Sequence, residues 1–140
     1  MIKIIVGWLT PIGGLVAAFW AVWTYHKSAK LGRARWMKEL YEKFYEQQQL
    51  KSVRRQLDSG DAQHIAKLVK DEDESFTDYL NFFEFLAYLE ESGQVKTEDM
   101  LGIFGYYLQN LKSSPAVVAY VKDPAKGYEK LRRIVEGDLQ

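Results

Sequence analysis

The sequence predicts an all-α fold, in which a single N-terminal transmembrane helix precedes a compact soluble domain of about five helices. No charged residue occurs between Lys3 and His26, and about 20 apolar residues are enough to cross a bilayer. The rest of the chain repeats apolar residues at steps of three and four, as helices do, and no segment alternates like a strand. We therefore expect a membrane anchor over residues 1–27 and a helical domain over residues 28–140.

Aromatic residues stand at the ends of the predicted anchor, where membrane helices meet the headgroups. They are Trp8 at one end and Trp20, Trp23 and Tyr25 at the other. A cleaved signal peptide is the alternative, but its apolar region should be shorter and should end at a small-residue cleavage site. Here bulky residues continue past the small pair Ala17 and Ala18. The pattern favours a retained helix.

Charge is distributed unevenly along a chain whose formal net charge is zero. Residues 26–55 are strongly basic, and residues 56–140 are strongly acidic. Basic residues beside a span favour the cytoplasmic side, so we expect the N-terminus outside and the domain inside. The residues expected at anionic lipid headgroups and the membrane interface are Trp20, Trp23, Tyr25, Lys27, Lys30, Arg33 and Arg35.

Small residues within the anchor suggest a contact with another membrane helix. Gly13, Gly14, Ala17 and Ala18 form a pattern of small residues four apart, which lets helices approach closely. The same spacing also arises by chance in apolar segments. The expected partner is a membrane protein complex or a second copy of the chain.

Helical patterns cover the domain. We expect helices over residues 33–57, 62–70, 76–91 and 97–111, and two more opened by Pro115 and Pro124. Gly32 is a weak point before the first, while Ser75 and Thr97 are expected as caps. Gly102 and Gly105 predict that another helix packs closely against the fourth.

Polar residues on the most hydrophobic helix define a candidate partner surface. Asn81, Glu84 and Tyr88 recur at steps of three and four, so they share one face of residues 76–91. Tyr106 and Tyr107 on the next helix complete this candidate set. The alternative is an ordinary solvated helix face.

Catalytic and metal-binding patterns are missing from the sequence. It has no cysteine and only two histidines, His26 and His64, which have no metal-ligand spacing. No phosphate loop or nucleophile motif occurs. We therefore expect no enzyme, cofactor, small-molecule substrate or nucleic-acid partner. A site using Glu84 with Asn81 is a remaining alternative.

The runs NFFEFLAYLEESG at residues 81–93 and FGYYL at residues 104–108 resemble an uncharacterised family of small bacterial proteins. The resemblance implies an N-terminal membrane helix, a helical domain of unknown function and a place in the bacterial inner membrane. It assigns no catalytic residue.

The predicted function is that of a non-enzymatic, membrane-anchored accessory or scaffolding subunit. Its span and its helical domain would dock on a larger membrane protein assembly. The alternative is a stand-alone inner-membrane regulator or defence-type effector that self-associates or binds a soluble partner.

Overall fold

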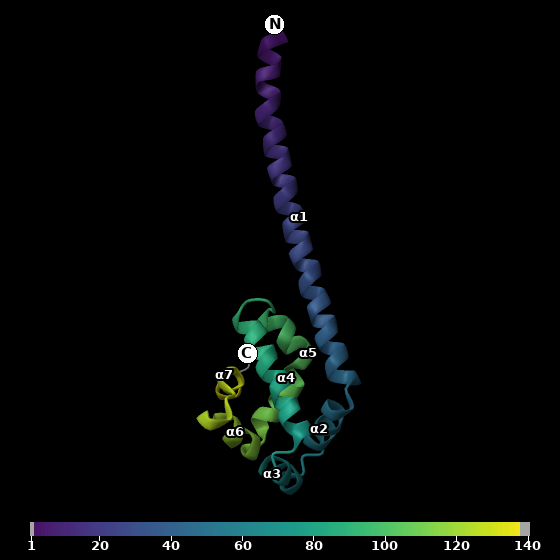
Figure 1. The fold of residues 1–140 in the computed structure, drawn as a ribbon, viewed down its shortest axis with the longest axis vertical. Coiled ribbons are helices and arrows are strands. Elements are labelled where there is room, and N and C mark those ends of the chain that lie inside the picture. Colours follow the sequence, from purple (N-terminus) through teal and green to yellow (C-terminus); the bar gives the residue numbers. More distant parts are fainter. Residues whose placement is uncertain (1, 138–140) are drawn as a thin grey trace. The chain divides into compact units, whose positions relative to one another are not determined.

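A computed structural model describes the backbone of residues 2–137 and the side chains of residues 16–137 (Figure 1). These residues form seven α-helices and one short 3-10 helix, and no β-strand occurs among them. The all-α prediction is confirmed. The predicted number of helices was too low, because two of the expected helices are each divided.

The helices follow one another with short connections. They are α1 (Ile2–Glu46), α2 (Gln48–Asp58), α3 (Ala62–Lys70), α4 (Glu74–Glu91), α5 (Thr97–Ser113), α6 (Pro115–Lys122), the 3-10 helix η1 (Pro124–Lys126) and α7 (Glu129–Glu136). Contacts divide the chain into two units, Met1–Met37 and Lys38–Gln140, and α1 contributes to both.

The predicted transmembrane helix is not supported. Among the residues whose side chains are described, no helix has a stretch long and apolar enough to cross a membrane. The prediction is corrected accordingly.

The first helix breaks at Gln47 and not at Gly32. One glycine costs a helix only about 1 kcal/mol relative to alanine, and α1 continues through Gly32. Gln47 instead has an extended backbone, with φ −69° and ψ 123°. Nη1 of Arg54 donates to the carbonyl oxygen of Phe44 at 3.2 Å, which satisfies one of the carbonyls left without a partner at the helix end. The helix predicted over residues 33–57 is therefore two helices.

Phe44, fully buried near the end of α1, is the centre of an aromatic core in the unit Lys38–Gln140. Its ring lies 4.8 to 5.8 Å, between centroids, from five rings of α4 and α5. They belong to Tyr79, Phe82, Phe83, Phe104 and Tyr107. The end of α1 is thus fixed to two helices that follow much later in the sequence.

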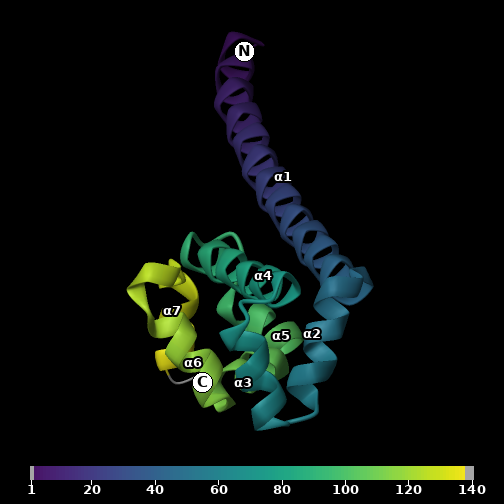
Figure 2. The same ribbon diagram turned by 60° about the horizontal axis from the view of Figure 1, so that its bottom comes forward.

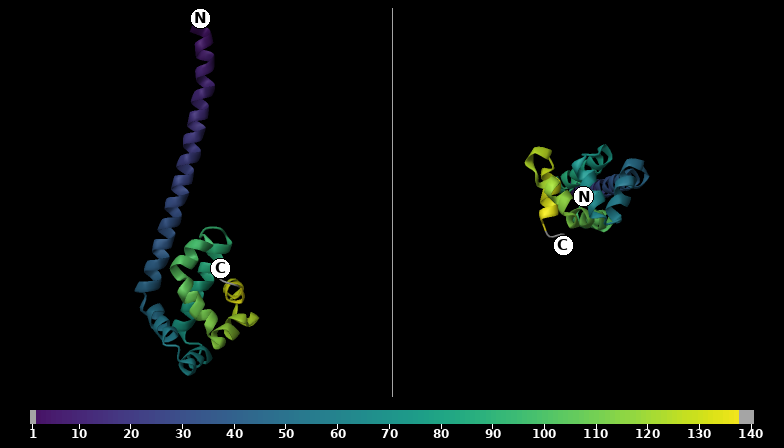
Figure 3. Two further views of the ribbon diagram at one scale, coloured as in Figure 1. Left: turned by 180° about the vertical axis from the view of Figure 1, so that it is seen from behind. Right: turned by 90° about the horizontal axis from the view of Figure 1, so that it is seen from below.

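Helix α4 lies in the middle of this unit (Figure 1). It contacts α2 on one side and α7 on the other, with α5 beside it, as the view from behind also shows (Figure 3). Helices α3 and α6 contact each other and lie side by side within the same unit (Figure 2). All of the large apolar residues of α4 except Phe85 and Tyr88 are buried.

Several helix ends differ from the prediction. The carboxylate of Asp73 caps α4 by accepting from the amide of Phe76 at 3.2 Å, because Ser75 already lies within the helix. Lys96, and not Thr97, is the N-cap residue of α5. Pro115 opens α6 as predicted. Pro124 opens only η1, since Gly127 adopts φ 82° and ends it before α7 begins.

No helix packs against Gly102 among the described residues. A Cβ built there meets nothing within 4 Å, and one built at Gly105 meets only Leu101 of its own helix, at 3.8 Å. The predicted close packing is therefore wrong, because the buried face of α5 is instead made by Met100, Phe104 and Leu108.

We predict that Phe44→Ala lowers the free energy of unfolding by about 3 to 5 kcal/mol, because it empties the centre of the aromatic core. Tyr41→Ala is the matched control, since Tyr41 is on the same helix but 47% exposed, and we expect a loss of at most about 1 kcal/mol. Urea unfolding of the full chain followed by circular dichroism measures both. Equal losses in the two variants would contradict the central role of Phe44.

Candidate functional site

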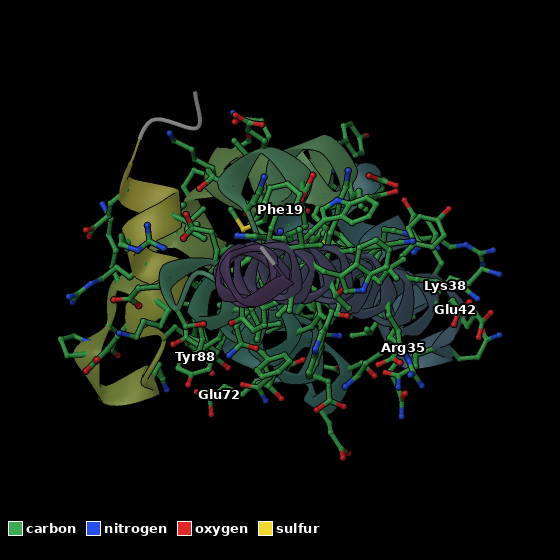
Figure 4. All side chains as sticks on the ribbon, turned by 90° about the horizontal axis from the view of Figure 1, so that it is seen from above. Phe19, Arg35, Lys38, Glu42, Glu72 and Tyr88 are labelled. Carbon is green, nitrogen blue, oxygen red and sulfur yellow. The ribbon has the colours of Figure 1, made fainter. Side chains whose placement is uncertain are left out.

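An exposed stripe on α4 is the clearest candidate surface of the helical domain. Asp78, Asn81, Phe85 and Tyr88 follow at steps of three and four, which places them on one face of the helix. Phe85 and Tyr88 are 44% and 50% exposed, and their rings stack with centroids 6.4 Å apart. Tyr88 lies at the outer edge of the domain in Figure 4. We call these four residues the α4 stripe.

Phe85 was missed as a surface residue because its chemistry suggested the core. Its position could have revealed it, since it follows Asn81 by four residues and precedes Tyr88 by three. The opposite face of α4 holds Phe83 and Leu86, both fully buried. Spacing, rather than hydrophobicity, separates the two faces.

Glu84 is directed to α7 and does not belong to the stripe. Its two carboxylate oxygens accept from the backbone amides of Lys130, at 3.1 Å, and Leu131, at 2.7 Å. These amides lie in the first turn of α7, where backbone donors lack helical partners and negative charge is favoured. Tyr128, the N-cap residue of α7, makes no side-chain cap. A carboxylate from another helix therefore caps α7.

Two further carboxylates join the end of α4 to α7. Glu91 pairs with Lys130 at 2.8 Å, and Glu90 pairs with Arg133. Glu90 also accepts from the hydroxyl of Thr97 at 2.6 Å. Burial alone raises the pKa of Glu90, but the hydrogen bonds from Thr97 and Arg133 outweigh it and hold the pKa below the ordinary 4.5. Glu90 is thus charged and paired in the folded domain.

The tyrosines of α5 have different environments. The hydroxyl of Tyr107 lies 2.9 Å from that of Tyr45, and its ring packs on Phe44. Burial, with this hydrogen bond, raises the pKa of Tyr107 to about 12. Tyr106 is 63% exposed and meets Tyr107 edge-on. Of the predicted partner set, Tyr107 and Glu84 make contacts within the domain, whereas Asn81, Tyr88 and Tyr106 are exposed.

Arg54 lies among the aromatic rings beside Phe44. Its guanidinium carbon is 4.5 Å from the centroid of the Tyr45 ring and 5.2 Å from that of Phe44. At such distances a cation is attracted to the negative face of a ring. The buried hydroxyl of Tyr79 has no hydrogen-bond partner within the described part of the chain, and burial raises its pKa. The cluster stabilises a helix junction and presents no open site.

A surface hollow lies in the described part of the chain, which contains no cluster of metal ligands. A shallow, open hollow of about 390 Å³ lies at the turn from α4 to α5, and its walls include the paired Glu90. No three His, Asp or Glu side chains of the described residues gather so that they could hold a metal ion.

The predicted lipid-interface residues lie on α1, within the unit Met1–Met37. Trp20, Trp23 and Tyr25 are more than half exposed, and the two tryptophan rings meet edge-on at 5.4 Å. Lys27 and Lys30 are exposed one to two turns further on. Arg33 is half-buried, whereas the side chain of Arg35 is exposed. In the second unit, Lys38 pairs with Glu42 at 3.5 Å (Figure 4).

The predicted contact of small residues can be followed only in part. Gly13 and Gly14 lie outside the residues whose side chains are described. Ala17 and Ala18 are exposed on α1.

Comparison of the chain with known protein families, curated proteins and solved structures finds no match. The resemblance to a small bacterial family with a membrane helix was therefore wrong. It rested on runs of aromatic and apolar residues, which the structure explains by packing in α4 and α5.

We predict that Glu84→Gln lowers the free energy of unfolding by about 1 to 2 kcal/mol, because it removes the charge that caps α7. The amides of Lys130 and Leu131 should then exchange with deuterium faster. Glu91→Gln is the control, since it removes an exposed ion pair from the same helix pair and should leave both amides protected. Equal exchange in Glu84→Gln and in the unaltered chain would contradict the cap.

We predict that Glu90→Gln flattens the acid side of the stability profile. A carboxyl group whose folded pKa is lowered stabilises the fold above its unfolded pKa, and this contribution is lost as pH falls through the folded pKa. The window therefore lies below the ordinary 4.5. Urea midpoints measured near neutral pH and at about pH 3 should differ less in Glu90→Gln than in the unaltered chain.

Glu136→Gln is the control for this comparison, because it removes an exposed carboxylate from the end of α7. The urea midpoint of this variant should fall between neutral pH and about pH 3 by as much as that of the unaltered chain. If the urea midpoint of Glu90→Gln falls with pH as much as that of the unaltered chain, other carboxyl groups cause the loss of stability in acid.

Proposed function

We propose that the chain is a non-enzymatic accessory or scaffolding subunit whose helical domain docks on a larger protein assembly. The observation that carries this proposal is the exposed ring stack of Phe85 and Tyr88 on α4. Aromatic residues are enriched in the parts of interfaces that contribute most binding energy. The surrounding helix buries its other large apolar residues, so these two rings are available to a partner.

The neighbours of the ring stack indicate the chemistry of the partner. Asp78 and Asn81 are exposed on the same stripe, one to two turns before the rings. They can accept hydrogen bonds, and Asp78 attracts a cation. The partner surface that fits best is an apolar pocket for the two rings beside a lysine, an arginine or backbone amides.

Self-association is a second candidate, favoured by the opposite charges of the two parts of the sequence. Residues 26–55 are basic and residues 56–140 are acidic, so the basic part of one copy attracts the acidic part of another. This arrangement corresponds to a stand-alone regulator that acts as an oligomer.

Photo-cross-linking in the native cell tests docking through the stripe. We predict that a photoreactive phenylalanine analogue at position 88 forms one adduct of defined mass, and that Phe85→Ala removes it while leaving the urea midpoint nearly unchanged. Tyr106→Ala is the matched control on the other exposed aromatic surface and should retain the adduct.

The mass of the cross-linked adduct and its behaviour in the variants distinguish docking on a larger assembly from self-association. An adduct that contains only a second copy of this chain supports self-association and rejects the larger assembly. Absence of any adduct, or an adduct that persists in Phe85→Ala, rejects docking through the stripe. A large loss of stability in Phe85→Ala would show that Phe85 is a packing residue.

A further inference from the structure

Most of the large side chains of α1 between Val16 and Trp23 lie on one face of the helix. Helical residues follow at about 100° per residue, so Val16, Phe19, Trp20 and Trp23 fall within an arc of about 100°. The small residues Ala17, Ala18, Ala21 and Thr24 fall on the other side. The four large side chains are all more than half exposed.

Two cations extend the same face. Lys27 and Lys30 fall within the arc of the large side chains, and both are exposed. At a rise of about 1.5 Å per residue, the face from Val16 to Lys30 is about 21 Å long. It presents aromatic rings over its first half and ammonium groups at its end. Val22 and Tyr25 are also exposed, but they lie on the side of the small residues and are not part of this face.

We propose that this face of α1, made of Val16, Phe19, Trp20, Trp23, Lys27 and Lys30, binds an anionic lipid surface while the helix lies along that surface. Tryptophan rings prefer the interface between hydrocarbon and headgroups, where their apolar body is buried and their N–H remains hydrated. Lysine stems pack against apolar surface while their ammonium groups reach the phosphates.

Charge decides between a lipid surface and a protein groove. No acidic residue occurs from residue 16 to residue 38, so the face and its surroundings attract anions only. Each basic residue near an anionic membrane contributes about a fivefold increase in binding. A large exposed apolar face that ends in cations matches the two terms that bind interfacial helices, namely apolar burial and attraction to anionic lipids.

Vesicle sedimentation of the full chain tests this proposal. The expected result is strong binding to vesicles of phosphatidylcholine mixed with phosphatidylglycerol, and weak binding to phosphatidylcholine alone. Added salt should reduce the difference, since it screens exposed charges. Tryptophan fluorescence should shift to shorter wavelength only with the vesicles that bind.

Two double variants separate the contributions. Lys27→Gln with Lys30→Gln should weaken binding to the anionic vesicles about 30-fold. The matched control, Lys96→Gln with Lys122→Gln, removes the same amount of charge from the helical domain and should leave vesicle binding unchanged. Trp20→Ala with Trp23→Ala should weaken binding to both vesicle types. Circular dichroism checks that each variant keeps its helix content.

Several results would overturn the proposal. Equal binding to the two vesicle types, equal losses in the two lysine variants, or no vesicle binding by the unaltered chain would each reject an anionic lipid surface. Binding to single-stranded DNA without binding to vesicles would assign the cations to nucleic acid instead. The cross-linking experiment at position 88 concerns other residues, so its failure leaves this test unaffected.

Discussion

The burial of Phe44 is the constraint on which the helical domain depends. Its ring contacts rings of α4 and α5, while its carbonyl oxygen accepts from Arg54 of α2. One residue thus joins the end of α1 to Arg54 of α2 and to α4 and α5, the two long helices that follow. The break at Gln47 follows from this arrangement, because α2 must turn back to bury Leu50 and Val53. A straight helix would leave these residues in water.

The sequence predicted what depends on local chemistry. The all-α class follows from the periodicity of apolar residues, α3 has the predicted bounds, and Pro115 opens α6 because proline suits a first helical turn. The break at Gln47 could not be predicted, since it depends on Arg54 reaching back over ten residues to Phe44. The transmembrane prediction rested on the absence of charge between residues 4 and 25, and the residues whose side chains are described do not support it.

For the candidate site, too, local spacing could not show which side chains are paired within the domain. Spacing alone grouped Glu84 with Asn81 and Tyr88, and all three do lie on neighbouring positions of α4. What separates Glu84 is its bond to the amide of Lys130, which follows 46 residues later and which no local pattern reveals. Tyr107 was likewise assigned to a surface, although its hydroxyl reaches Tyr45. Only the tertiary fold distinguishes a side chain that serves the domain from one that a partner can reach.

The carboxylates of α4 also affect how the domain forms during synthesis. Glu84 and Glu91 find their partners in residues 130 and 131 of α7, and Glu90 pairs with Arg133 of α7 in addition to Thr97 of α5. A nascent chain that has emerged as far as α5 therefore already contains the aromatic core but leaves one side of α4 uncovered and acidic. This side is covered only once α7 has been made and packs on α4. A chain shortened before α7 would therefore keep its aromatic core but leave Glu84 and Glu91 without the partners that α7 supplies.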